Sequence, residues 1–169
     1  MNSNKYVNSQ QIKKNKKTMI QRIQSIYLLL SSLLMVSLFF IPFAQIETET
    51  KEIYSFIYRG LVNGGGEIVI PTLALAILLS SATLVSFVTI FVFKKRVLQI
   101  RLCGLNIALL LGSTGMIYYL GTQIIDEIAG VMGYQITTAF PVIAAILTFL
   151  ALRAIGKDIA LLKSMDRIR

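Results

Sequence analysis

The chain has 169 residues, of which 55% are hydrophobic and 15% charged, and its net charge is +9. Soluble domains average about 25% charged residues, so this composition excludes an ordinary soluble domain and indicates a helical membrane protein. With no histidine and a single cysteine, Cys103, the chain lacks the residues for a histidine-based triad, an internal disulfide or a thiolate metal cage. We expect no cofactor.

Residues 1–18 are polar and basic and show no apolar period, which is typical of a disordered extension. Met19 is a plausible initiator in its own right. We predict that residues 19–169 form a single membrane domain that crosses the bilayer four times.

The first apolar stretch sets the class of the protein. Residues 26–44 contain no ionisable side chain, and about 20 apolar residues are needed to cross a hydrocarbon layer of ~30 Å. Arg22 precedes the stretch, where its guanidinium can stay among the headgroups, and Pro42 marks a helix end. We predict a transmembrane helix over about 24–44. A cleaved signal peptide is the alternative interpretation of a basic flank followed by an apolar run.

Three further apolar stretches predict three more spans, over about 68–93, 102–120 and 136–153. Pro71 falls in the first turn of the earliest of these, where its missing N–H is tolerated. The predicted fold is therefore an all-α membrane protein, an antiparallel bundle of four transmembrane helices.

The loops after the first and third spans differ in composition. Residues 52–62 are rich in Ile, Tyr, Phe and Val and are followed by the run NGGG at 63–66, which favours a short β-hairpin; a plain interfacial loop is the alternative. Residues 121–135 carry the adjacent carboxylates Asp126 and Glu127. Consecutive helical residues point about 100° apart, so this pair suits a solvated loop better than acid–base catalysis.

Small residues recur at a spacing of four along the third span. Such a stripe lets helix backbones approach closely, so we predict that it packs within the bundle, with a dedicated dimer interface as the alternative. Asn106, the most polar uncharged residue inside a span, is expected to bond to a neighbouring helix. The stripe consists of Gly104, Ala108 and Gly112, with Gly115 close by.

Residues 154–169 continue the periodic apolar pattern beyond the last span. Ile155, Ile159 and Leu162 recur at three to four residues, with charged residues mostly elsewhere, which predicts a cationic amphipathic helix. Such a helix would lie along the inner leaflet on anionic lipids; docking onto a partner protein is the competing interpretation.

Basic residues gather on one side of the predicted bundle. Residues 1–25, 94–101 and 153–169 carry six, four and five of the 17 Lys and Arg, and the other two loops carry only Lys51 and Arg59. The positive-inside rule therefore predicts that both termini and the central loop are cytoplasmic. These basic segments lack interleaved aromatic residues, so nucleic-acid binding is not expected. The residues predicted to contact anionic lipid are Arg22, Lys94, Lys95, Arg96, Arg101, Arg153, Lys157, Lys163, Arg167 and Arg169.

The two ends of this domain carry a resemblance to a known family. MIQRIQSIYLLL at Met19 to Leu30 and RAIGKDIALLKSMDRIR at Arg153 to Arg169 resemble the start and finish of small four-span inner-membrane proteins of Bacteroidota, known as domain of unknown function forty-two ninety-three. The resemblance covers Met19 to Arg169 and implies a bacterial inner membrane. It supplies no catalytic or binding residue.

Three functions are compatible with this sequence. The preferred hypothesis is a non-enzymatic accessory or scaffold subunit that engages membrane lipids, a membrane-protein partner or a second copy of the chain. A small-solute transporter or channel subunit is the first alternative, although pathways through a bilayer normally contain ionisable residues and the spans contain none. A membrane enzyme acting on lipid is the second, with Glu67, Asp126 and Glu127 as the candidate catalytic groups.

Overall fold

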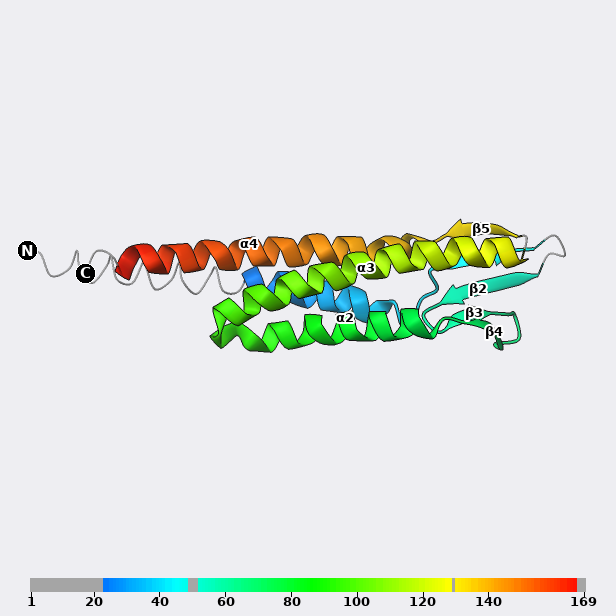
Figure 1. Cartoon of the computed structure of the whole chain (residues 1–169), viewed down its shortest axis with the longest axis horizontal. Helices are drawn as coiled ribbons and strands as arrows, with labels where there is room; N and C mark the ends of the chain where they lie inside the picture. Colours follow the sequence, from blue (N-terminus) through cyan, green and yellow to red (C-terminus); the bar gives the residue numbers. More distant parts are fainter. Residues whose placement is uncertain (1–22, 49–51, 129, 167–169) are drawn as a thin grey trace, which may run out of the picture.

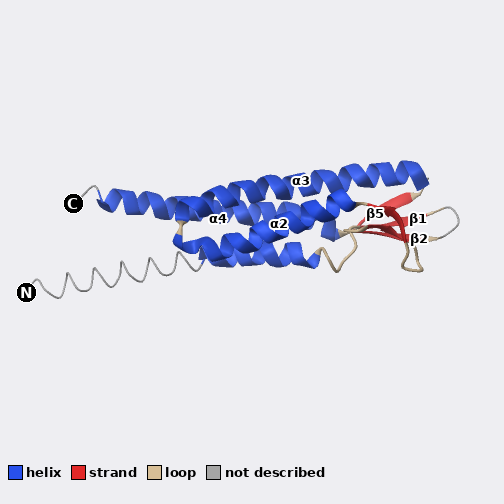
Figure 2. Ribbon diagram, turned by 60° about the horizontal axis from the view of Figure 1, so that its bottom comes forward, coloured by secondary structure: helices blue, strands red, loops and turns tan. Residues whose placement is uncertain are grey.

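The computed structural model describes residues 23–48, 52–128 and 130–166. Its helices lie side by side in an elongated body, and the strands gather at one end (Figure 1; Figure 2). We call this the sheet end, and the opposite end, where α2 turns into α3, the basic end. The helices of the described residues are Ile23–Ser37, α2 (Leu73–Phe91), α3 (Arg96–Ile128) and α4 (Phe140–Asp166), with the 3-10 helices η1 (Val92–Lys94) and η2 (Ile136–Ala139) between them.

The sheet is antiparallel and has the order β4-β3-β2-β1-β5. Its strands come from both of the segments that follow the first and third apolar stretches, because β5 pairs with β1, with Ala44 opposite Tyr134. The chain therefore joins two loops that are about 90 residues apart in sequence into one sheet. The strands are β1 (Ala44–Glu47), β2 (Ile53–Ile57), β3 (Gly60–Val62), β4 (Ile68–Pro71) and β5 (Val131–Tyr134).

The predicted β-hairpin is confirmed, and the expected turn at the glycine run is present. This run connects the antiparallel strands β3 and β4, where the side-chain oxygen of Asn63 accepts the backbone N–H groups of Gly65 and Glu67 at 3.1 and 2.9 Å. Asn side chains commonly close turns in this way. The sequence did not predict the additional turn at Tyr58 and Arg59, where the chain reverses between β2 and β3.

The first predicted span, 24–44, extends beyond the C-terminal end of the helix in the structure. The described helix stops at Ser37, and Ala44 opens β1. The backbone N–H of Phe43 donates to the carbonyl of Phe56 at 2.7 Å, so the last apolar residues of this stretch belong to the sheet. A buried backbone group can be hydrogen-bonded in a sheet as well as in a helix. Apolar composition alone therefore does not distinguish a buried strand from a buried helix.

The second predicted span, 68–93, begins too early for the same reason. Residues Ile68–Pro71 form β4 and the helix starts at Leu73, so Pro71 ends a strand instead of occupying a first helical turn. β4 is an edge of the sheet, the position where a proline without an N–H is tolerated.

α3 and α4 are both longer than the predicted spans 102–120 and 136–153. α3 includes the basic residues Arg96 and Arg101 and continues to Ile128. Asp126 and Glu127 therefore lie in its last turn, and the expected loop over 121–135 is wrong there. α4 runs without a break to Asp166, which confirms a helical continuation of the last span over its described part. The separate tail helix that we expected along the membrane surface is part of the same straight helix (Figure 1).

Two buried clusters hold the described residues together. The larger one joins one side of the sheet to the helices and includes Phe43, Ile46 and Phe56. The rings of Phe43 and Phe56 pack edge to face, with their centroids 5.5 Å apart. The smaller one lies toward the basic end and contains Leu28, Cys103, Ala151 and Ile155. Both ends of the helical body are thus fixed by interior contacts.

Candidate functional site

Two polar contacts join helices in the interior of the helical body. Asn106 of α3 donates to the hydroxyl of Ser86 in α2 at 2.8 Å, and the Ser86 hydroxyl lies 3.1 Å from the Asn106 carbonyl oxygen. On the other side, the hydroxyl of Ser31 donates to the carbonyl of Ala144 in α4 at 3.1 Å and lies beside Thr148. All of these side chains are satisfied and buried, so they serve packing.

The stripe of small residues in α3 lies on the exposed face of that helix. Gly104, Ala108, Gly112 and Gly115 are all exposed, and a Cβ atom built on any of the three glycines would meet no other atom within 4 Å. The expectation that this stripe packs within the helical body is therefore wrong, because α2 and α4 contact the opposite face of α3, which carries Cys103, Asn106 and Leu110. A contact with another chain stays a prediction.

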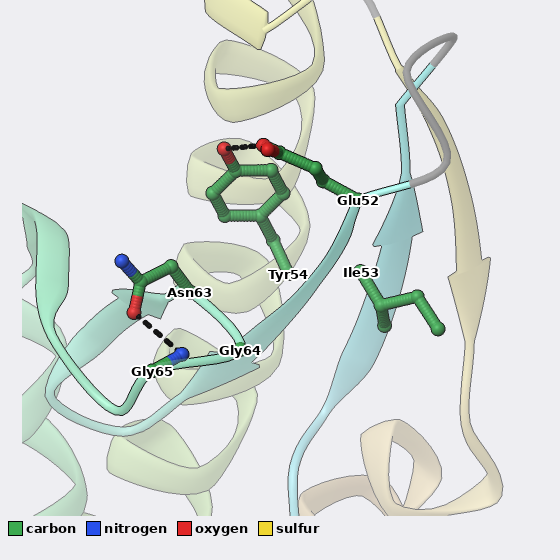
Figure 3. Close-up of a pocket in the computed structure, with 6 residues that line it drawn as sticks. All are labelled: Glu52, Ile53, Tyr54, Asn63, Gly64 and Gly65. Carbon is green, nitrogen blue, oxygen red and sulfur yellow. Dashed lines mark hydrogen bonds between the residues drawn. The ribbon is translucent and has the colours of Figure 1, made fainter.

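A shallow cleft of about 490 Å³ opens at the sheet end. Figure 3 shows Tyr54 and Glu52 side by side on one wall, with the glycine turn on the other. The Tyr54 hydroxyl donates to Glu52 Oε2 at 2.8 Å. This hydrogen bond, and then the charge of the Glu52 carboxylate, raise the pKa of Tyr54 above its ordinary value. The lining residues are Glu52, Ile53, Tyr54, Asn63, Gly64 and Gly65.

A smaller pocket of about 90 Å³ lies at the basic end, among the first turn of the helix Ile23–Ser37, η1 and the first turn of α3. We call it the basic-end pocket. Two of its polar side chains are buried: Gln99 donates to the carbonyl of Thr89 at 3.3 Å, and Gln24 Nε2 has no hydrogen-bond partner in the described part of the chain. The pocket is lined by Gln24, Ser25, Phe93, Arg96 and Gln99.

Beside this pocket, Arg96 forms an ion pair with Asp158 of α4. Asp158 is only 4% exposed, so the pair ties the start of α3 to α4 in a largely buried setting. Sequence reasoning missed this pair because its partners are 62 residues apart and Asp158 looked like one more charge on the polar side of an amphipathic tail. Arg96, predicted to contact anionic lipid, is thus already bonded to a carboxylate.

Other predicted lipid-contact residues keep exposed side chains: Lys95, Arg101, Arg153 and Lys157. Arg22, Arg167 and Arg169 lie outside the described residues, as do the side chains of Lys94 and Lys163. The structure thus describes exposed cations on the α2–α3 turn, on the first turns of α3 and on α4, all toward the basic end (Figure 1).

The candidate catalytic carboxylates lie in two separate places at the sheet end. Asp126 and Glu127 are exposed in the last turn of α3, and Glu67 is exposed just before β4. Within the described ranges, no three His, Cys, Asp or Glu side chains are grouped in a way that could hold a metal ion. These carboxylates therefore offer no assembled set of chemical groups in the described part of the chain.

The helices have the composition of a membrane protein. Three of them, α2, α3 and residues 136–160, are long and apolar enough to cross a membrane, and the described part of the first, Ile23–Ser37, is shorter. This defines the chain as a mostly helical protein with three to four apolar helices and a small antiparallel sheet. The family model "Domain of unknown function (DUF4293)" matches residues 20–168, so the chain belongs to that family. No curated protein matches the sequence.

Proposed function

We propose that the chain is a multi-pass protein of a bacterial inner membrane and acts as a non-enzymatic accessory or scaffold subunit. The observation that carries this proposal is that two helices extend beyond their apolar parts, α3 at the sheet end and α4 at the basic end. α3 has 33 residues, or about 50 Å of helix, and its last turns run along β5 at the sheet end. α4 continues eight residues beyond Asp158 at the basic end, or about 12 Å.

Exposed apolar side chains support membrane insertion. Between 28% and 33% of the residues in the three apolar windows are buried within the chain, so most of these apolar side chains face outward. A contiguous apolar surface of this extent needs lipid or another protein as its surroundings. α2, with 19 residues or about 28 Å, matches a hydrocarbon layer of ~30 Å, and the sheet begins directly beyond its first residue.

The distribution of charge supports one orientation. Exposed basic residues lie mainly at the basic end, with Arg59 at the sheet end, and five described acidic residues lie at the sheet end, with Asp158 and Asp166 on α4 at the other: Glu47, Glu52, Glu67, Asp126 and Glu127. Because Lys and Arg are retained on the cytoplasmic side, we infer that the basic end faces the cytoplasm and the sheet faces outward, with both chain termini cytoplasmic. A subunit of this kind presents a folded sheet on one side of the membrane and a rigid cationic helix on the other.

Cysteine labelling tests the membrane placement. In a Cys103→Ser background, Gly65→Cys in the sheet-end turn should react with a membrane-impermeant maleimide once the outer membrane is opened. Lys95→Cys in the α2–α3 turn should react only after the inner membrane is permeabilised. Equal labelling of both positions in intact inner membranes would contradict the proposed orientation.

Co-purification tests the accessory role. The native chain, purified in mild detergent, should carry a stoichiometric membrane-protein partner or a second copy of itself. Replacing the exposed Arg153 and Lys157 by Glu should reduce that association at least tenfold if the exposed basic face of α4 makes the contact. Arg59→Glu at the sheet end is the matched control. Recovery of a lone monomer, with no change in cells when Arg153 and Lys157 are altered, would contradict the role.

A further inference from the structure

The two edges of the sheet differ in how they are protected. At the β4 edge, Pro71 lacks an N–H group, and the pairing of β4 with β3 shifts its register between Leu61 and Val62. Proteins use proline, bulges and charged residues to keep the edges of sheets from pairing with other chains. β5, with the sequence VMGY, has no proline, no charge and a regular pairing with β1. The β5 edge is therefore open.

The backbone of β5 directs hydrogen-bonding groups away from β1. The N–H of Gln135 donates to the carbonyl of Phe43 at 2.8 Å, and the next pair along the ladder is Ala44 with Tyr134. Hydrogen-bonded and non-hydrogen-bonded pairs alternate in an antiparallel ladder, so Tyr134 and Met132 point their N–H and C=O groups outward. Within the described ranges, no other element forms a backbone hydrogen bond with these groups. They match what the backbone of an added strand offers.

The side chains of β5 leave space for such a strand and offer it apolar contacts. Val131 is 78% exposed, and Gly133, on the same face of the strand, is exposed and has no side chain to obstruct a neighbour. On the other face, the ring of Tyr134 stacks on that of Tyr118 from α3, with their centroids 6.4 Å apart, and both rings are exposed. An added strand would thus contact apolar groups with both of its faces, and a large side chain would fit beside Gly133.

Carboxylates surround the start of β5. Glu47 lies opposite Val131 in the ladder, and Asp126 and Glu127 end α3 just before the strand. All three carboxylates are exposed, and none of them forms an ion pair with another residue that the structure describes. A segment with a Lys or Arg near this end of β5 would be complementary in charge.

The geometry of the body excludes a second copy of the chain as the added strand. The strands run along the long axis of the molecule, as the helices do (Figure 1; Figure 2). Antiparallel pairing of β5 with β5 of a second copy would relate the two by a two-fold axis perpendicular to the strands, so their basic ends would point in opposite directions. Copies inserted in a membrane in the same orientation cannot pair in this way, and β4 of a second copy presents the protected edge.

We propose that the free edge of β5 binds an extended segment of another protein, which joins the sheet as an additional strand. The outward N–H and C=O groups of Met132 and Tyr134 bond to the backbone of the segment, the exposed side chains of β5 and Tyr118 contact its apolar side chains, and the carboxylates near Val131 attract its basic residue. This assignment rests on the proposed membrane placement, and it names the kind of partner that the accessory role requires.

Site-specific photocrosslinking of the full-length chain in its own host cells tests the proposal. Benzoylphenylalanine in place of Val131 should give one discrete protein adduct, which mass spectrometry should map to a single segment of the partner. Benzoylphenylalanine in place of Val69, which is exposed on the opposite edge strand β4, is the control and should not give this adduct. Equal yields of the adduct from the two positions would overturn the assignment to the β5 edge.

Backbone and charge variants separate strand addition from general contact. Met132→Pro removes an outward N–H but no ladder bond to β1, a change that edge strands tolerate, and it should lower the adduct yield at least tenfold relative to Met132→Ala. Circular dichroism must show that the two variants unfold at the same temperature. If they do not, the surface variant Glu127→Lys decides: it should lower the yield at least threefold, whereas Glu67→Lys, beside β4, should change it less than twofold.

The remaining outcomes identify what failed. An adduct that maps to lipid or to a second copy of the chain would overturn the assignment to another protein. Equal yields from Met132→Pro and Met132→Ala would show that the backbone of β5 does not take part. A stoichiometric partner in the co-purification experiment, together with no adduct at Val131, would overturn the β5 contact alone and leave the accessory role standing.

Discussion

The glycines of the sheet end and those of α3 occupy opposite surroundings. At the sheet end, a Cβ on Gly60 would overlap the carbonyl oxygen of Ile70, and one on Gly130 would come within 2.7 Å of the Ile46 side chain. Along α3, a Cβ on Gly104, Gly112 or Gly115 would meet nothing within 4 Å. The sheet end is therefore specified by close contacts between particular atoms, whereas the outer face of α3 is specified only by being apolar.

The largest effect is expected at Gly60. Its φ is +144°, a conformation that side-chain-bearing residues rarely adopt, and the added methyl group of Gly60→Ala would push β4 away from β3. We expect a loss of about 3 kcal/mol or more in the free energy of unfolding, because backbone strain of this kind alone costs about 1–3 kcal/mol. Thermal unfolding in detergent, followed by circular dichroism, measures the loss.

Gly66→Ala is the control for this comparison. Gly66 also has a positive φ, +84°, but open space lies around it, so only the backbone term of about 1–2 kcal/mol remains. If both variants unfold at the same temperature, the close approach of β4 to Gly60 does not stabilise the sheet.

A smaller loss is expected inside the helical body. Asn106→Ala removes the bond to Ser86 that joins α2 to α3, and interhelical hydrogen bonds of this type are worth about 0.6 kcal/mol on average and at most about 1.7. A double-mutant cycle with Ser86→Ala isolates the coupling between the two side chains. Additive losses in that cycle would mean that the pair contributes no coupling.

Gly112→Ala should have an effect of similar size and of the opposite sign. Glycine in a helix interior is less favourable than alanine by roughly 0.5–1 kcal/mol, and the exposed face of α3 leaves room for the methyl group. The free energy of unfolding of the monomer should therefore rise slightly. A fall, or a change in oligomeric state in sedimentation experiments, would indicate that this face contacts another chain.

The smallest expected effect is the ionisation of Tyr54. Glu52 raises the pKa of Tyr54 in the folded state, so the folded chain holds this proton to a higher pH than the unfolded chain does. The resulting stabilisation is fully present below about pH 10 and is lost as the pH rises through the folded-state pKa. Glu52→Gln should lower the pKa of Tyr54, which NMR of ring-labelled tyrosine can follow. An unchanged pKa would show that the two groups do not interact.

Local properties of the chain were readable from the sequence alone. Apolar runs without charge identified α2, α3 and α4, and the composition of residues 52–62 with the glycine run after them identified a β-hairpin. Both inferences succeed because hydrophobicity and β-propensity are carried by each residue and its near neighbours. The predicted helix boundaries were wrong where apolar residues such as Ala44 and Ile70 form strands, because strands and helices both use apolar residues.

Only the tertiary structure decided which distant residues meet. The pairing of β1 with β5, the ion pair between Arg96 and Asp158, and the burial of Gln24 at the basic-end pocket all join segments far apart in the chain. The exposed position of the stripe at Gly104 has the same origin, because the rotation of α3 about its axis is set by α2 and α4 packing on its other face. Hydrophobicity determined that the helices associate, and the fit between particular side chains determined which faces they use.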